Sequence, residues 1–178
     1  AEVFAAAHII GSINIALRGQ YANWAGTLLN YEQPIILIAN LEEEEEAITR
    51  MARVGIENIS GYLNGGMLSV QEQPDLIRSF HRYTPAQLRE RLEEPKTPFL
   101  LDVRRETEAH LGKIEGSVNI PLAQLNEHIE EIPKDREVAI YCAGGYRSAI
   151  AASILQTNGY MEPKDLIGGY DAWVATKT

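Results

Sequence analysis

The chain has 178 residues, of which 45% are hydrophobic and 23% charged, with a formal net charge of −9 and a single cysteine. This length suffices for one large core or two small ones, and the negative charge argues against nucleic acid and anionic membranes as partners. No apolar run approaches the roughly 18 residues of a membrane-spanning helix and no signal-peptide pattern occurs, so we expect no membrane partner. A lone cysteine cannot form an internal disulfide, which fits a cytoplasmic location.

The first part of the chain contains a segment that recurs later. Residues 8–15 and 113–120 are identical at five of eight aligned positions. The correspondence continues through a pair of apolar strand-like runs, a pair of helices with a terminal glycine, and a pair of double glycines. In chain order, these pairs are residues 34–39 and 137–141, Gly55 and Gly159, and residues 65–66 and 168–169. The repeat predicts two copies of one α/β unit.

We expect the first copy, residues 1–75, to have lost its chemistry. Asn40 stands where the second copy has Cys142, and the connection from there to the helix-ending glycine is two residues shorter. The glutamates at 42–46 would repel anions. A solvated first turn that suits the helix dipole explains them, and a docking surface for a basic partner is the alternative. The copy begins at the equivalent of Thr107, without a first strand and helix, so we expect the natural protein to continue upstream.

The second copy, residues 84–178, follows a predicted linker at residues 76–83. Thr84 is the expected N-cap of a short helix, with Pro85 at the first helical position and Gln87 placed for a capping box. The copy begins with a strong helix-start signal, so its N-terminal boundary is predicted from local sequence.

Two further apolar patterns in the second copy predict helices. Apolar residues at spacings of three and four indicate one amphipathic helix: Leu122, Leu125, Ile129 and Ile132. Another stripe, followed by Gly159 as the residue after the helix end, consists of Ile150, Ile154 and Leu155. Strands that alternate with helices predict the α/β fold class, with two units that are each a mostly parallel sheet covered by helices on both faces. The first of these units is expected to be truncated at its N-terminus.

Cys142 ends an apolar run that starts at Val138, and a helical pattern follows shortly after it. Two glycines beyond the cysteine let the backbone point its N–H groups inward, and the helix dipole favours an anion there. The thiol is therefore expected to be a thiolate at neutral pH. Arg147 supplies a fork-shaped cation for an anionic substrate, and Ser148 is the expected helix cap.

These features predict a nucleophile in an anion-binding loop. The predicted catalytic residues are Cys142 and Arg147. The predicted substrate-binding residues are the rest of the loop: Ala143, Gly144, Gly145, Tyr146 and Ser148. A small, buried, inert cysteine is the alternative, but it would not need two glycines and an arginine within the next five residues.

The loop resembles the active-site loop of rhodanese sulfurtransferases, and three other segments are similar to motifs of that family in the same order. They are residues 100–104 (an Asp-x-Arg motif), 112–121 (with Lys113 in place of the family's usual histidine) and 168–173 (Gly-Gly-x-x-x-Trp). The resemblance covers roughly residues 82–178. It implies that Asp102 and Arg104 support the loop.

A tandem of an inactive and an active rhodanese unit resembles the C-terminal part of fusion proteins with a metallo-β-lactamase-like, iron-dependent persulfide dioxygenase domain. Residues 20–29 strengthen this resemblance. It implies that such an upstream domain of the same polypeptide is a partner and holds the iron. No cofactor or metal is expected in residues 1–178 themselves, because His8, His81, His110 and His128 lack metal-ligand spacing.

The resemblance implies that a sulfane sulfur moves from thiosulfate or a low-molecular-weight persulfide to sulfite, a thiol or cyanide through a Cys142 persulfide. Because Arg147 is the only cation of the loop, a persulfide donor is favoured. Two alternatives remain. Phosphatase or arsenate reductase chemistry on the same fold would place the arginine six residues after the cysteine, where this chain has five. A non-catalytic regulatory module is the hypothesis for residues 1–75, as an interface to the upstream domain.

Overall fold

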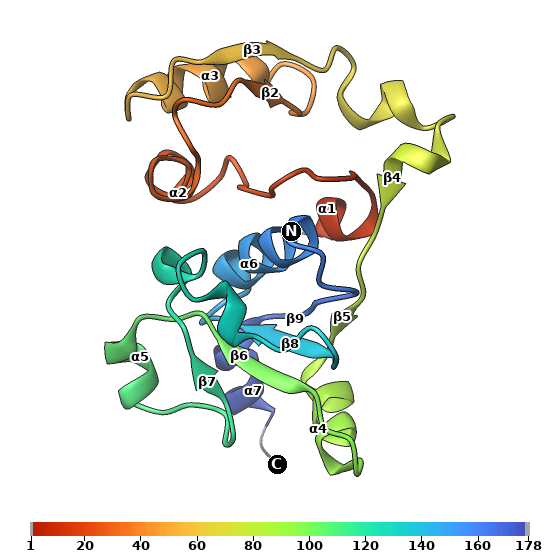
Figure 1. Cartoon of the computed structure of the whole chain (residues 1–178), viewed down its shortest axis with the longest axis vertical. Coiled ribbons are helices and arrows are strands. Elements are labelled where there is room, and N and C mark those ends of the chain that lie inside the picture. The colour runs from red at the N-terminus through yellow and green to blue at the C-terminus, as the bar shows by residue number, and fades with distance from the viewer. Residues whose placement is uncertain (1, 177–178) are drawn as a thin grey trace. The chain divides into compact units, whose positions relative to one another are not determined.

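The computed structural model describes residues 2–176, which form two compact units (Figure 1). The C-terminal unit comprises residues 2–6, 11–14 and 79–176, and the N-terminal unit comprises residues 7–10 and 15–78. Each unit has its own buried apolar cluster. The units are described separately below.

The C-terminal unit is built on a five-stranded sheet in which every neighbouring pair is parallel, in the order β5-β9-β8-β6-β7. Its strands are β5 (Arg82–Tyr83), β6 (Phe99–Asp102), β7 (Val118–Asn119), β8 (Val138–Tyr141) and β9 (Lys164–Leu166). Its helices are α1 (Glu2–Ala6), α4 (Pro85–Glu93), α5 (Glu106–His110), α6 (Tyr146–Thr157) and α7 (Gly169–Ala175), with 3₁₀ turns η3 (Leu122–Gln124) and η4 (Ile129–Glu131). Figure 1 shows α6 on one side of the sheet and α4 and α7 on the other. The predicted α/β class with a mostly parallel sheet is confirmed.

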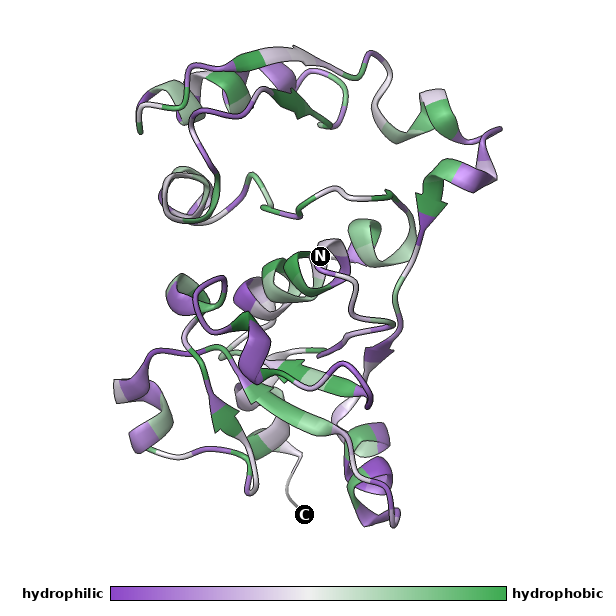
Figure 2. Ribbon diagram, viewed as in Figure 1, coloured by the Kyte–Doolittle hydropathy of each residue, from purple (hydrophilic) through white to green (hydrophobic). Residues whose placement is uncertain are grey.

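The core of this unit lies on both faces of the central strands. All four residues of β8 are buried, as expected for a parallel strand covered on both sides. Tyr141 faces the cluster that contains Leu88 of α4 and Trp173 of α7. The hydrophobic colouring of β6, β8 and α6 in Figure 2 follows the same arrangement. These strands are thus fixed at the centre of the sheet, and the residues that follow them are held in place.

Local signals of the second copy are confirmed at both of its longer helices. At α4, the Gln87 amide donates to Thr84 Oγ1 at 3.3 Å and the Thr84 amide donates to Gln87 Oε1 at 2.9 Å, which completes the capping box. At α6, Gly159 follows the helix end with φ +81°, a left-handed conformation that favours glycine.

The helix predicted from Leu122 to Ile132 is wrong. Two separate 3₁₀ turns, η3 and η4, occupy this stretch. The Leu125 amide donates to the Leu122 carbonyl, and the Ile132 amide donates to the Ile129 carbonyl, both at 3.2 Å. Each apolar pair is three residues apart, which matches the period of a 3₁₀ helix as well as one face of an α-helix. The spacing pattern could not separate the two.

The N-terminal unit is smaller. Its α-helices are α2 (Tyr21–Leu28) and α3 (Glu44–Ala52), its strands are β1 (His8–Ile9), β2 (Ile35–Leu37), β3 (Ile59–Tyr62) and β4 (Ile77–Arg78), and its 3₁₀ helices are η1 (Gly66–Val70) and η2 (Pro74–Leu76). The pair β2 and β3 is parallel, and β1 and β4 are antiparallel. The helix α3 connects β2 to β3, and its Met51 packs with Leu37 in the core of the unit. The glutamates of its first turn match the solvated helix start expected there.

The structure differs from the predicted domain boundaries in two places. The expected linker, residues 76–83, contains β4 of one unit and β5 of the other, so only residues 79–81 lie between the strands. Residues 2–6 and 11–14, expected in the first domain, belong to the C-terminal unit. They do so because backbone hydrogen bonds hold them there. The Phe80 amide, for example, donates to the Ala5 carbonyl at 3.0 Å.

Each unit contains a parallel strand–helix–strand segment that ends in two glycines of similar conformation. Gly65 and Gly66 have φ of +80° and +54°, and Gly168 and Gly169 have φ of +71° and +59°. Leu37 pairs with Tyr62, three residues before Gly65, just as Ile140 pairs with Asp165, three residues before Gly168. Counted from these pairs, Ala39 occupies the position of Cys142.

The expectation that Asn40 occupies this position is therefore off by one residue. The register of the strands decides it, because the loop between strand and helix differs in length and gives the sequence alignment no fixed point. Neither Ala39 nor Asn40 carries a thiol.

Candidate active site

Cys142 follows the last residue of β8, so it lies at the carboxyl end of a central strand, where parallel α/β sheets bind their ligands. The next three residues form a turn, and α6 begins at Tyr146. Gly145 makes this turn possible, because it adopts φ +98° at the N-cap position of α6. The predicted position between a buried strand and a helix N-terminus is the one observed.

The Cys142 sulfur is enclosed by the start of α6. The Gly145 amide donates to Cys142 Sγ at 3.1 Å, and Ser148 Oγ lies 3.6 Å from the sulfur. The side chain is buried, with 1% of its surface exposed. Because amide hydrogens and the helix dipole favour negative charge, this position suits a sulfur anion.

Ser148 is placed differently from the expected cap. It lies in the first turn of α6, three residues after the N-cap glycine, and its hydroxyl faces the Cys142 sulfur. The remaining predicted loop residues vary in exposure. Gly144 is exposed, and nothing lies within 4 Å of a Cβ atom added there, so the loop opens to solvent at this residue. Ala143 and Tyr146 are half-buried.

The back of the loop is held by the N-terminus of α7. The Tyr170 amide donates to the Cys142 carbonyl at 2.7 Å, and the Asp171 amide donates to the Ala143 carbonyl at 3.1 Å. A Cβ atom at Gly169 would come within 2.3 Å of the Cys142 carbonyl oxygen. This contact requires glycine at 169, and the double glycine is therefore part of the site.

Asp102 and Arg104 form a buried ion pair that supports the loop indirectly. Arg104 Nη2 donates to Asp102 Oδ2 at 2.6 Å and to the Gly112 carbonyl at 2.8 Å. Its guanidinium also lies 4.2 Å from the centre of the Tyr170 ring. Tyr170 in turn holds the Cys142 carbonyl, so the pair connects β6 to the loop through α7. Asp102 accepts four hydrogen bonds from Arg104, an arrangement that suits support rather than proton transfer.

Arg147 is held by a carboxylate that sequence reasoning did not single out. Its Nη1 and Nη2 donate to Glu108 Oε2 and Oε1, both at 2.7 Å. This contact lowers the pKa of Glu108 to about 2 and raises the pKa of Arg147, which is raised further by the Cys142 sulfur. Glu108 is 39 residues from Arg147, and no local pattern connects them.

A second missed pair lies beside the loop. Arg82 Nε and Nη2 donate to the two oxygens of the buried Asp165, at 2.7 and 2.9 Å. A Cβ atom at Gly145 would lie 3.9 Å from Arg82 Nη2, so this pair borders the loop. The pKa of Arg82 is raised by its hydrogen bond to Asp165. Its charge is therefore fixed and matched.

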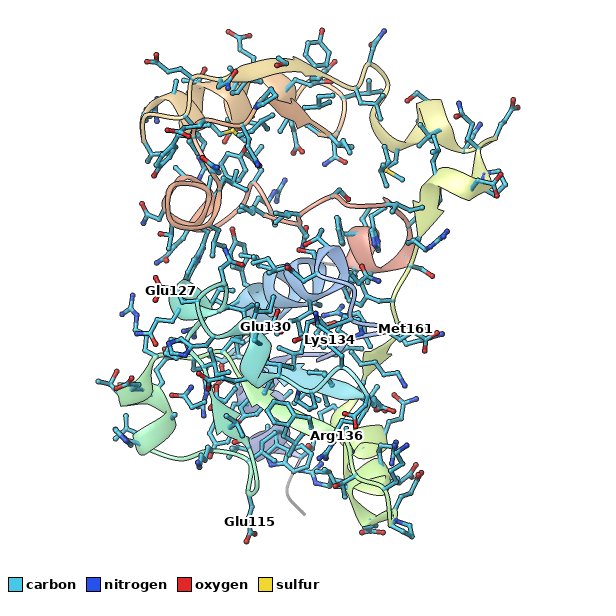
Figure 3. The ribbon with its side chains drawn as sticks, viewed as in Figure 1. Glu115, Glu127, Glu130, Lys134, Arg136 and Met161 are labelled. Atoms are coloured by element: carbon cyan, nitrogen blue, oxygen red, sulfur yellow. The ribbon has the colours of Figure 1, made fainter. Side chains whose placement is uncertain are left out.

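Other features of the described chain offer less. A surface hollow of about 330 Å³ borders the amino ends of the strands, opposite to Cys142; Figure 3 labels three of its residues, Lys134, Arg136 and Met161. Within residues 2–176 no three metal-ligating side chains gather, and none of the helices there is long and apolar enough to cross a membrane.

The geometry of strand, loop and helix agrees with comparisons to known proteins. The profile of the rhodanese-like domain matches residues 84–176, just over half of the chain. The chain belongs to the rhodanese-like family. The match includes all four motifs identified in the sequence, and it ends at the last residue that the structure describes.

Named relatives match the same unit. A sulfurtransferase of Allochromatium vinosum is 37% identical over 86 residues, which cover 48% of this chain and 80% of that protein. The thiosulfate sulfurtransferase GlpE of Coxiella burnetii is 32% identical over 76 residues, 43% of this chain and 71% of that protein. Some other relatives are covered less fully, one Bacillus subtilis protein to 59%.

A solved structure supports the fold. The rhodanese-related protein of Thermoplasma volcanium superposes with a TM-score of 0.51 at 32% sequence identity, over 55% of this chain and 94% of that one. Lys113, where the chain departs from the family's motif, donates to the Ser117 carbonyl at 3.2 Å. The lysine thus closes the turn between α5 and β7 of this rhodanese-like domain.

Proposed function

We propose that this chain is a rhodanese-type sulfurtransferase in which Cys142 carries the transferred sulfur as a persulfide. The observation that carries the proposal is the Gly145 amide 3.1 Å from Cys142 Sγ at the start of α6. A second sulfur on Cys142 would sit among the same N–H groups, which stabilise negative charge. The names of two relatives, a sulfurtransferase and a thiosulfate sulfurtransferase, support the same chemistry.

The first half-reaction loads the enzyme. The Cys142 thiolate attacks the sulfane sulfur of the donor and forms a new S–S bond. The donor's own bond to that sulfur breaks, and its electron pair leaves with sulfite when the donor is thiosulfate, or with a thiolate when it is a persulfide. Cys142 then carries a terminal sulfur, and no cofactor enters the balance.

The second half-reaction regenerates the thiolate. A thiol, sulfite or cyanide attacks the terminal sulfur of the Cys142 persulfide, the S–S bond to Cys142 breaks, and the electron pair returns to Cys142 Sγ. Since one covalent intermediate links two half-reactions, ping-pong kinetics are expected.

The other site residues have distinct proposed roles. Arg147 stabilises charge on the leaving group and on the persulfide. The remaining loop residues bind the sulfur and the donor: Ala143, Gly144, Gly145, Tyr146 and Ser148. Asp102 and Arg104 act as supports, through the contact between Arg104 and Tyr170 described above. A low-molecular-weight persulfide is the proposed donor, because Arg147 is the only cationic residue between Cys142 and Ser148.

Mass spectrometry of the intact chain tests the proposal. Incubation with a donor is expected to add one sulfur atom to Cys142, and Cys142→Ser is expected to lose the adduct and turnover together. The absence of an adduct with both thiosulfate and glutathione persulfide, or undiminished turnover in Cys142→Ser, would overturn it. Hydrolysis of an aryl phosphate by the pure protein, abolished in the same variant, would instead favour phosphatase chemistry.

We further propose that the N-terminal unit is a degenerate rhodanese-like copy. Its support is the pair of glycines described above and the close approach at each. A Cβ atom at Gly66 would come within 2.6 Å of the Ala39 carbonyl oxygen, as one at Gly169 would approach the Cys142 carbonyl oxygen. With Ala39 at the position of the nucleophile, this unit is proposed to serve as a regulatory or interface module.

The proposed partner of that module is an upstream metallo-β-lactamase-like, iron-binding domain of the same polypeptide, in the cytoplasm. Deleting the N-terminal unit from such a longer polypeptide is expected to uncouple persulfide oxidation from sulfur transfer. The measurement is the yield of transferred sulfur per oxidised persulfide. An unchanged yield would refute the interface role.

A further inference from the structure

The cation of the active-site loop is already occupied. Both terminal nitrogens of Arg147 donate to the Glu108 carboxylate at 2.7 Å, and the Arg105 amide also donates to Glu108 Oε2, at 3.1 Å. The side chains of Arg147 and Glu108 are 17% and 33% exposed, so water screens the pair only partly. A bidentate contact of this kind fixes the plane of the guanidinium as well as its charge.

The pair is ionised throughout the neutral pH range. Its hydrogen bonds to Arg147 lower the pKa of Glu108 to about 2. The pKa of Arg147 is raised first by Glu108 and also by the Cys142 sulfur, so the guanidinium lies between two negative groups. An approaching donor therefore meets an arginine whose charge is balanced on its far side.

The same balance holds for the other two arginines described at this end of the sheet. Arg104 is paired with Asp102, and Arg82 is paired with Asp165. Each of the three cations thus has its own carboxylate within 2.7 Å. The attraction that remains for a donor comes from the amides at the start of α6, which can hold one sulfur but provide no full positive charge.

This balance has different consequences for the two donor classes. Thiosulfate is a small dianion, and its sulfonate lies next to the sulfane sulfur, so it needs positive charge close to Cys142. The persulfide of a low-molecular-weight thiol has a carbon chain at that place, and its other charges lie farther away. A carboxylate near Arg147 therefore penalises thiosulfate more than a persulfide.

We propose that Glu108 is a specificity-determining residue that selects persulfides of low-molecular-weight thiols against thiosulfate by neutralising Arg147. The inference rests on the proposed sulfur-transfer function of Cys142. Glu108 acts through Arg147 and is a positioning residue. A helix-capping role of Glu108, through its contact with the Arg105 amide, is compatible with this role but would not change the preference between donors.

The test compares kcat/KM for thiosulfate and for glutathione persulfide, with cyanide as acceptor, in the wild type and in Glu108→Gln. Removing the carboxylate is expected to raise kcat/KM for thiosulfate about tenfold while that for the persulfide changes by less than about threefold. The gain for thiosulfate should shrink as ionic strength rises. Glu106→Gln is the matched control, because Glu106 is an exposed carboxylate on the same helix.

Glu108→Asp retains the charge and is expected to keep the donor ratio of the wild type. Glu108→Ala, which leaves no acceptor at all, repeats the test should thermal unfolding show that Glu108→Gln is unstable. An unchanged ratio in both charge-removing variants, or an equal change for both donors, would overturn the inference while leaving sulfur transfer intact. Failure of the wild type to load sulfur on Cys142 from either donor would instead defeat the proposed function.

Discussion

The two units end a central parallel strand in different ways. In the C-terminal unit, β8 leads into Cys142 and a glycine turn whose amide meets the sulfur. In the N-terminal unit, β2 leads through Ala39 into a turn where Glu42 has φ +71°, and α3 starts with three glutamates. One helix N-terminus thus faces a sulfur and the other is matched by carboxylates. The comparison teaches that the scaffold survives without the anion-binding loop.

The support behind the loop also differs. In the C-terminal unit, β6 lies beside β8 and carries the Asp102–Arg104 pair, whereas the described part of the N-terminal sheet pairs β2 with β3 alone. A catalytic loop needs a fixed position, while a degenerate one does not. The predictions below break or sharpen this comparison.

The largest effect is expected from breaking the buried pair on β6. Asp102→Asn leaves Arg104, which is 4% exposed, without its counter-charge. The free energy of unfolding is expected to fall by about 3 kcal/mol, a typical cost for removing one partner of a buried ion pair. Urea unfolding measures it, with Glu106→Gln as a surface control expected to change it by less than about 0.5 kcal/mol. A loss as small as that of the control would show that the pair does not stabilise β6.

A smaller effect is expected where the two units are most alike. Gly169→Ala would place a Cβ atom 2.3 Å from the Cys142 carbonyl oxygen, and Gly66→Ala would place one 2.6 Å from the Ala39 carbonyl oxygen. Each is expected to cost about 2 kcal/mol through the clash and the left-handed backbone. Gly169→Ala alone should also slow sulfur transfer, because it displaces the loop that carries the nucleophile.

Gly144→Ala is the control for that experiment, since open space surrounds a Cβ atom at this position. Thermal unfolding and the rate of persulfide formation measure the two effects. Equal slowing of sulfur transfer by Gly66→Ala would contradict the separation of roles between the units. An active, stable Gly169→Ala would show that the loop tolerates movement there.

Sequence patterns predicted the parts of the site that are local. The capping box at Thr84, the glycine after α6 and the strand–cysteine–glycine turn each depend on residues within a few positions of one another. The ion pairs around the loop were not predicted, because Glu108 and Arg147 are 39 residues apart and Arg82 and Asp165 are 83 apart. Only the parallel order of the strands brings such residues together.

The smallest effect is expected from acid titration of the pair at the loop. Glu108 has a pKa of about 2 in the folded state against an ordinary value of 4.5. A carboxyl with a lowered folded-state pKa contributes stability above its unfolded value, and that contribution is lost as the pH falls from about 4.5 towards 2. Glu108→Gln is therefore expected to lose less stability than the wild type between these pH values in urea unfolding. Parallel pH profiles for both proteins would mean that the contact between Glu108 and Arg147 contributes nothing measurable to stability, as is common for partly exposed pairs.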